Sequence, residues 1–409
     1  MTEDITAILL PTARVDVFAL DDGTAASAAK IAADWRFARV GLDVVRGGMD
    51  AAIERYSHAA SPEMIIIETN DISEAFTAQL GALAEVCAAG TDAVIIGPTN
   101  DVHLYRSLVG MGVRDYLVRP VAENDMVGVI ASALIEKRGL TGSRLVAVIG
   151  GKGGVGATVM AQALAWNVAE GLKQKTMLID VAGSSGTVGI AFGADPAASF
   201  ADVVRVGQSG SEDDLKRIIQ KTTDNLSLLI SGGDPVLADK PDADSVEAMV
   251  ERIMKTYPVV VADISGASPA VQKRLITRAA HVVVVTSPHI AALRNCRMLV
   301  MDIKNARGGL GQVDLILNNI GLPGADEVPA KDIQGVMDME PAAKIAFAPK
   351  IFMHAETTGK PVADNRAAQD VLKSLMPLAA RAAGAQMTVD DKKEGGGFNL
   401  LRSLGKNKK

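Results

Sequence analysis

The sequence predicts an α/β protein in which two mostly parallel sheets follow one another along the chain. Short apolar runs recur through the 409 residues, and stretches with helical periodicity separate them. Hydrophobic residues make up 48% of the chain but aromatic residues only 3%, so aliphatic side chains must fill the cores. Such alternation is typical of parallel sheets that helices cover on both faces.

The first set of apolar runs predicts a flavodoxin-like domain over residues 1–136. Its expected strands are 15–20, 40–45, 64–67, 93–96 and 115–118. A polar, glycine-containing stretch at 137–143 is the predicted linker. The second set predicts a second α/β domain over residues 144–386. Its expected strands are 145–149, 176–180, 227–230, 258–262, 282–286, 313–317 and 344–347. Residues 387–409, with a triple glycine, predict a flexible basic tail.

A glycine-rich loop follows the strand expected at 145–149 and precedes an apolar helix. Strand, loop and helix start form an anion site, because backbone N–H groups face inward and the helix dipole favours negative charge. The phosphate-binding pattern G-x-x-x-x-G-K-[ST] is matched by Gly151, Gly156 and Thr158. Ala157 stands at the lysine position, so the loop is a P-loop that lacks one lysine.

The same loop also matches the dinucleotide pattern G-x-G-x-x-G through Gly151, Gly153 and Gly156. The strand expected at 176–180 ends at Asp180, near the place of a ribose-binding acid. This alternative predicts an enzyme with NAD or FAD, and a tight turn without any ligand is a third interpretation. The five histidines form no spaced cluster, and no residue is assigned a catalytic role.

The segment KGGVGAT, from Lys152 to Thr158, resembles the deviant Walker A loop of the MinD/ParA ATPases. The resemblance implies a nucleotide-sandwich homodimer in which Lys152 reaches the phosphates of the partner. It also implies ATP and magnesium as the ligands, with no other cofactor. The implied nucleotide-binding residues are Gly151, Lys152, Gly153, Gly154, Val155, Gly156, Ala157, Thr158, Val159, Asp180 and Asn318.

Two further strand ends agree with this resemblance. Asp263 follows strand 258–262 and is placed to hold a magnesium-bound water as a Walker B aspartate does, while Thr158 offers a hydroxyl to the same ion. Asn318 follows strand 313–317 and matches the asparagine that contacts adenine in the family. A strand-end cap and a turn-forming asparagine pair remain the structural alternatives for Asp263 and Asn318.

Two departures from the family pattern predict a weakened site. Ala157 removes a lysine whose charge-assisted bonds contribute about 1.5–3 kcal/mol each, so nucleotide affinity should fall by roughly one or two orders of magnitude. The family's second strand usually ends D-x-D, but here Ala182 replaces the second acid, which helps to position the attacking water. We therefore expect weak ATP binding and weak or absent hydrolysis.

The first domain resembles the receiver domains of response regulators over about residues 13–136. Receivers carry a phosphorylated aspartate after the third strand, but here Glu68 occupies that position as a pseudo-acceptor. Arg119 precedes Pro120 where receivers have a lysine. We expect an atypical receiver that serves docking or dimerisation rather than a phosphate switch, with an unrelated flavodoxin-like domain as the alternative.

An atypical receiver followed by a degraded MinD-like domain resembles the TadZ/CpaE family, which helps to localise and assemble the Tad (Flp) pilus machinery at the cell pole. The resemblance covers roughly residues 13–384. The stretch from Lys344 to Ala355 looks like the family's I-P-F-D-P segment, with Ala348 in place of its aspartate. The resemblance implies action by dimerisation and by recruitment of Tad machinery components. The alternatives are an active MinD/ParA-type ATPase that positions another cargo, and the dinucleotide-binding enzyme.

Composition narrows the class of partner and the location. A net charge of −6 argues against bulk nucleic-acid binding. Cys87 and Cys296 lack C-x-x-C spacing and suit a reducing cytoplasm, and no apolar run reaches 18 residues. Residues 398–409 carry four basic and four apolar side chains and no acid, which predicts reversible contact with an anionic membrane surface, with a solvated tail as the alternative. We expect a cytoplasmic protein, at the cell pole or the inner face of the membrane.

Overall fold

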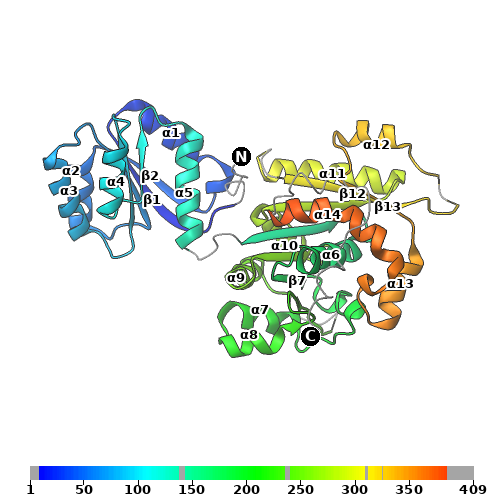
Figure 1. Ribbon diagram of the computed structural model, residues 1–409. Helices are drawn as coiled ribbons and strands as arrows, with labels where there is room; N and C mark the ends of the chain where they lie inside the picture. The colour runs from blue at the N-terminus through cyan, green and yellow to red at the C-terminus, as the bar shows by residue number, and fades with distance from the viewer. Residues whose placement is uncertain (1–8, 138–142, 235–239, 309–311, 325, 385–409) are drawn as a thin grey trace, which may run out of the picture.

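The computed structural model describes residues 9–137, 143–234, 240–308, 312–324 and 326–384. Figure 1 shows two α/β units, which we call the N-terminal unit (residues 9–137) and the C-terminal unit (residues 143–384). Each unit contains one sheet, and all neighbouring strands are parallel except one pair at an edge. The predicted α/β fold with two mostly parallel sheets is confirmed.

The N-terminal unit has the flavodoxin-like strand order β2-β1-β3-β4-β5. Its strands are β1 (Ala13–Ala19), β2 (Val40–Arg46), β3 (Met64–Glu68), β4 (Asp92–Gly97) and β5 (Asp115–Val118). Its helices are α1 (Asp22–Ala32), α2 (Met49–His58), α3 (Glu74–Val86), α4 (Val102–Gly110) and α5 (Glu123–Lys137), with a 3-10 turn at Trp35–Phe37. Each strand overlaps one of the five apolar runs, because a central parallel strand is buried on both faces.

The C-terminal unit has the strand order β13-β12-β11-β6-β10-β7-β9-β8. Its strands are β6 (Arg144–Gly150), β7 (Thr176–Asp180), β8 (Gln220–Lys221), β9 (Leu226–Leu229), β10 (Val259–Asp263), β11 (His281–Thr286), β12 (Gln312–Ile320) and β13 (Ala343–Ala346). Strand β10 lies between β6 and β7, whereas the classic dinucleotide fold places its first two strands side by side. The topology therefore argues against the dinucleotide alternative.

Helices cover both faces of this second sheet. They are α6 (Ala157–Trp166), α7 (Phe200–Ser209), α8 (Glu212–Ile218), α9 (Ala243–Met254), α10 (Pro269–Arg278), α11 (Ile290–Ala306), α12 (Ala330–Met337), α13 (Pro349–Thr358) and α14 (Gln369–Ala383). A π-helical turn at Asn167–Gly171 extends α6, and 3-10 turns occupy Gly183–Ser185, Gly189–Phe192, Val362–Asp364 and Arg366–Ala368. Helices α6 and α14 pack on one face, and α7, α9, α10, α11 and α12 pack on the other. Within the described ranges, no helix is both long enough and apolar enough to cross a bilayer.

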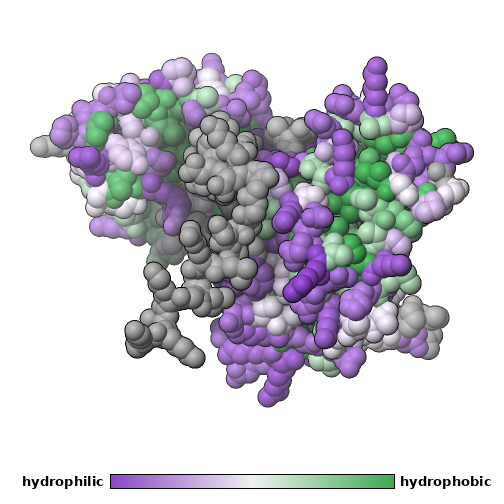
Figure 2. Space-filling view, turned by 45° about the vertical axis from the view of Figure 1, so that its right-hand side comes forward, coloured by the Kyte–Doolittle hydropathy of each residue, from purple (hydrophilic) through white to green (hydrophobic). Residues whose placement is uncertain are grey.

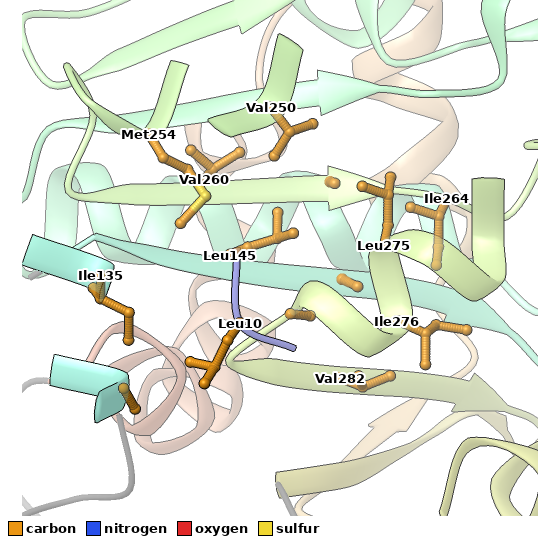
Figure 3. Packing of buried hydrophobic residues seen from close by; sticks show 14 of the residues in the cluster. Leu10, Ile135, Leu145, Val250, Met254, Val260, Ile264, Leu275, Ile276 and Val282 are labelled. Atoms are coloured by element: carbon orange, nitrogen blue, oxygen red, sulfur yellow. The ribbon is translucent and has the colours of Figure 1, made fainter. Parts of the chain in front are cut away.

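The two units share one hydrophobic cluster (Figure 3). Leu10 and Ile135 of the N-terminal unit belong to the same buried cluster as Leu145 and Ile276 of the C-terminal unit. Hydrogen bonds and ion pairs also cross the junction. The Leu9 backbone N–H donates to the Thr277 carbonyl oxygen at 3.0 Å, and the Arg39 guanidinium pairs with the buried Glu247 carboxylate at 2.7 Å.

The domain division remains a prediction, because this core extends across the predicted boundary. Residues 138–142 of the predicted linker lie outside the described residues, and so does the predicted tail at 387–409.

Candidate nucleotide site

The glycine loop joins the buried strand β6 to helix α6 at the carboxyl edge of the second sheet. Gly156 caps α6 with φ +87°, a backbone conformation that favours glycine. A Cβ atom at this position would also lie 2.5 Å from Nδ2 of Asn318. Asn318 Nδ2 donates to the Val155 carbonyl oxygen at 2.9 Å, so Asn318 and the loop are held together.

A second close contact, with helix α11, requires a glycine at position 151. The Gly151 N–H donates to the Val285 carbonyl oxygen at 2.8 Å, and a Cβ atom there would lie 2.8 Å from Cβ of Cys296. Cys296 is fully buried on α11, so this helix directly supports the loop. By contrast, a Cβ on Gly153 or Gly154 would meet nothing within 4 Å, and both glycines are exposed. The side of the loop that carries Gly151 and Gly156 is therefore packed. The side that carries Gly153 and Gly154, which we call its front, is open to solvent.

Thr158 and Asp263 meet as the sequence predicts. The Thr158 hydroxyl donates to Oδ2 of Asp263 at 2.5 Å, and the Ser265 N–H donates to Oδ1 at 3.1 Å. Asp263 is buried at the end of β10, next to β6. Hydroxyl and carboxylate oxygens are ligands that magnesium prefers. The described residues contain no group of three or more His, Cys, Asp or Glu that could hold a metal ion, so magnesium here would also need phosphate or water ligands.

Asp180 lies opposite Asp263 on the neighbouring strand β7. Its carboxylate accepts from the N–H groups of Ala182 at 3.1 Å and Val188 at 3.0 Å. Burial raises the pKa of Asp180 to about 6, and the negative charge of Asp263 adds to the rise, although the backbone hydrogen bonds oppose it. Two neighbouring carboxylates that repel one another favour a nearby cation.

Two buried polar atoms at this edge lack a hydrogen-bond partner among the described residues. They are Oδ1 of Asn318 and Nε2 of His289. Unpaired buried polar atoms are uncommon and call for a physical explanation, such as a ligand. The Asn318 amide oxygen is free to accept from an amino group while its nitrogen holds the loop. The residues present therefore fit a nucleotide with magnesium.

The two alanines lie where the sequence indicated. Ala157 is buried in the cluster on the α6 face, and Val159 packs at its margin. Ala182 directly follows β7. Lys152 is exposed and donates from Nζ to the Gly153 carbonyl oxygen at 3.0 Å, so it lies on the open front of the loop. Its cross-subunit role remains a prediction.

Sequence reasoning missed Ser265 and Cys296. The Gly150 N–H donates to the Ser265 hydroxyl at 3.3 Å, and Cys296 supports Gly151. Ser265 lies two residues beyond Asp263, and this closeness in sequence is a weak indication that it belongs to the site. Nothing in the pattern around Cys296 indicates that it packs against the loop.

The pseudo-acceptor Glu68 lies at the end of β3 and is fully buried. Its Oε2 accepts from the N–H groups of Leu20 at 2.7 Å and Asp21 at 3.1 Å. Its Oε1 accepts from the Thr24 hydroxyl at 3.1 Å and from the Arg119 guanidinium at 3.2 Å. Four donors thus surround one carboxylate, as a phosphoryl group would be surrounded.

Arg119 also lies 3.6 Å from the Asp21 carboxylate. A backbone hydrogen bond from Thr24 is the largest cause that lowers the pKa of Asp21, and Arg119 lowers it further. This acidic residue is therefore held as an anion beside Arg119.

Comparison with known proteins relates the chain to several families. The model of the cellulose biosynthesis protein BcsQ family matches residues 143–316. A ParA family ATPase from Chlorobium tepidum TLS is 16% identical over 58% of this chain and 97% of its own, with a TM-score of 0.51, which shows the fold alone. No curated protein matches the chain.

Two pilus assembly proteins are more similar in sequence. CpaE from Caulobacter crescentus CB15 is 34% identical over 31% of this chain and 95% of its own, with a TM-score of 0.30. CpaE2 from Sinorhizobium meliloti 1021 is 34% identical over 29% of this chain and 98% of its own, with a TM-score of 0.29. Identity at this level over nearly the whole length of each relative identifies the family. The chain belongs to the CpaE (TadZ) family of pilus assembly proteins.

Proposed function

We propose that the protein is an assembly and localisation factor of the Tad (Flp) pilus, which binds ATP and magnesium weakly and acts by dimerisation and partner recruitment. Membership of the CpaE family supports the pilus role. The proposal of weak nucleotide binding rests on which residues are kept and which are replaced at the glycine loop. The Thr158–Asp263 pair is intact, whereas Ala157 and Ala182 replace the lysine and the second acid.

This combination separates binding from turnover. The loop N–H groups and the start of α6 still attract an anion, so phosphate binding does not depend on the missing lysine alone. Hydrolysis needs, in addition, charge stabilisation of the transferred group and an oriented water. Neither Ala157 nor Ala182 can supply these. The proposed role therefore depends on binding of the nucleotide and not on its hydrolysis.

Dimerisation at the loop edge is supported by Lys152 and by the surface around it. Ile290, Met353 and Ile190 are exposed by 75%, 62% and 51%, and they lie on segments that follow strands β11, β13 and β7. Figure 2 shows hydrophobic side chains gathered on the side of the C-terminal unit that carries α12 and α13 in Figure 1. Exposed apolar patches of this kind mark interaction sites.

A steady-state phosphate-release assay with ATP and magnesium tests the proposed lack of turnover. We expect release far slower than that of a MinD/ParA relative with both lysines, and little further loss in Asp263→Ala. Turnover comparable with such a relative, abolished by Asp263→Ala, would support the alternative of an active ATPase that positions another cargo.

We also propose that the protein is cytoplasmic, at the cell pole or the inner face of the membrane, with contact through residues 398–409. Four basic side chains near an anionic surface contribute about 1 kcal/mol each, or roughly millimolar binding for one tail. A second tail in a dimer raises avidity. Liposome sedimentation of the full chain should therefore be weak and salt-sensitive. A chain that ends at Lys393 should not sediment, and equal sedimentation of both would contradict the tail's role.

A further inference from the structure

Two helices lead from the candidate nucleotide site to the junction between the units. Helix α10 begins beyond Ser265, and the Gln272 side chain donates from Nε2 to the carbonyl oxygens of Ile264 at 3.0 Å and Ser265 at 3.3 Å. Helix α11 supports the glycine loop, because Cys296 packs against Gly151. One helix therefore holds the loop after β10, and the other holds the glycine loop.

The other ends of the two helices are fastened to each other. Arg307 directly follows α11 and is fully buried, and its guanidinium donates to the carbonyl oxygens of Ile276 at 2.6 Å and Ala279 at 2.7 Å. These carbonyl groups lie at the end of α10, where the helix dipole favours a cation. A shift of either helix along its axis would strain both bonds, so we expect the two helices to move together.

The N-terminal unit covers this joined end. The Trp35 ring lies 5.9 Å from Cζ of Arg307, and a Cβ atom on Gly308 would overlap the same ring. The Leu9 N–H donates to the Thr277 carbonyl oxygen in the last turn of α10. Two segments of the N-terminal unit thus contact the same two helices that hold the nucleotide site.

The Asp263 carboxylate connects the site itself to α10. Its Oδ1 accepts from the Ser265 N–H, and Gln272 of α10 holds the carbonyl oxygen of the same serine. The charges of Asp263 and Asp180 repel one another, and a cation bound with a nucleotide would turn this repulsion into attraction to the ion. A ligand shifts a conformational equilibrium only through interactions that differ between two states, and this electrostatic change supplies such a difference.

We propose that the N-terminal unit regulates the nucleotide site, with α10 and α11 as the connection between Trp35 and the two loops of the site. The inference rests on the proposed nucleotide binding and adds a region that controls it. Coupling between two sites is reciprocal. Nucleotide binding should therefore change the packing around Trp35, and a change at Trp35 should alter nucleotide affinity. A partner that binds the N-terminal unit at this junction would set the occupancy of the site.

The chain carries its own reporter of this coupling. Trp35 and Trp166 are its only tryptophans, so Trp166→Phe leaves the fluorescence of Trp35 alone. We expect the emission of Trp35 to shift when ATP and magnesium are added, at the concentrations at which calorimetric titration shows binding. The control is the same chain with Ala157→Asp, which places a negative charge at the start of α6 and should lose both the binding and the shift.

The reverse direction is measured as ATP affinity by calorimetric titration. Trp35→Leu removes the ring beside Arg307 and should lower the affinity by at least about fivefold, whereas Trp35→Phe keeps a ring and should lower it less. The matched control is Phe76→Leu, which truncates a fully buried ring in a cluster that contains no described residue of the C-terminal unit. Calorimetry separates coupling from partial unfolding, because unfolding lowers the number of binding sites and coupling lowers their affinity.

An ATP affinity in Trp35→Leu equal to that of the unaltered chain would overturn the inference and leave the proposed nucleotide binding standing. So would a constant Trp35 emission at ATP concentrations that saturate the calorimetric signal. An equal loss of affinity in Trp35→Leu and Phe76→Leu would also overturn it, because the effect would then come from general destabilisation. Absence of calorimetric binding in the unaltered chain would overturn both the inference and the proposed binding of ATP.

Discussion

The carboxyl edges of the two sheets differ in what occupies the position that the sequence predicts for a phosphate. In the N-terminal unit, Glu68 fills the site with its own carboxylate, and four donors surround that carboxylate. In the C-terminal unit, Ala157 removes a cation, and polar atoms such as Oδ1 of Asn318 are left without partners in the described structure. We therefore expect the longer acid to close the first edge to ligands, and the missing lysine to leave the second edge open to weak binding.

The largest expected effect comes from Glu68→Ala in the N-terminal unit. The variant leaves the N–H groups of Leu20 and Asp21 and the Thr24 hydroxyl without this acceptor. Arg119 keeps Asn70 as an acceptor. Each buried group left unpaired costs about 1–3 kcal/mol, so we expect a loss of several kcal/mol. Urea unfolding of the full chain measures this loss. The control is Glu123→Ala, which removes the exposed partner of Lys30 and should cost less than about 1 kcal/mol. An equal loss of unfolding free energy in the two variants would show that the hydrogen bonds of Glu68 contribute little to stability.

The next effect concerns the open site. Ala157→Lys should tighten ATP binding by about ten- to a hundredfold, because one charge-assisted contact contributes about 1.5–3 kcal/mol. Calorimetric titration with ATP and magnesium measures the gain. Ala330→Lys, at an exposed alanine of α12, is a control for added charge. No gain at position 157 would indicate that the buried setting of Ala157 excludes a working lysine.

A smaller effect is expected for Asn318→Ala. The variant loses the hydrogen bond to the Val155 carbonyl oxygen, which should reduce stability by about 1 kcal/mol, and it loses the unpaired amide oxygen. Affinity for ATP should fall, while affinity for inorganic triphosphate should fall less if Asn318 contacts the base. Asn319→Ala serves as the neighbouring control. An equal loss for both ligands would assign Asn318 to loop support alone.

The smallest expected effect is none at all. Incubation with a small phosphodonor such as acetyl phosphate should leave the mass of the chain unchanged, because Glu68 is buried and already fully hydrogen-bonded. Mass spectrometry of the intact chain measures this directly. A labile phosphate mapped to residues 64–70 would refute the comparison on which these predictions rest.

Sequence patterns were sufficient for the sheets but not for the contacts that distinguish the sites. The long parallel strands were predictable because burial on both faces requires uninterrupted apolar runs. Strand β8 was not, since Gln220–Lys221 is too short to show a pattern. The position of Glu68 was predictable, but two of its donors are backbone N–H groups, whose direction no residue type encodes. The contact between Gly151 and Cys296 joins segments far apart in sequence and had no local signal.

The shared core around Leu10, Ile135, Leu145 and Ile276 has a mechanical consequence. A hinge between the units would let the N-terminal unit turn independently of the glycine loop. The packed junction instead fixes the direction in which the N-terminal unit faces. If two copies associate at the proposed loop edge about a two-fold axis, their N-terminal units would therefore lie at a defined distance and orientation. A pair of surfaces held in this way can bind a partner at two points only where the partner offers matching spacing.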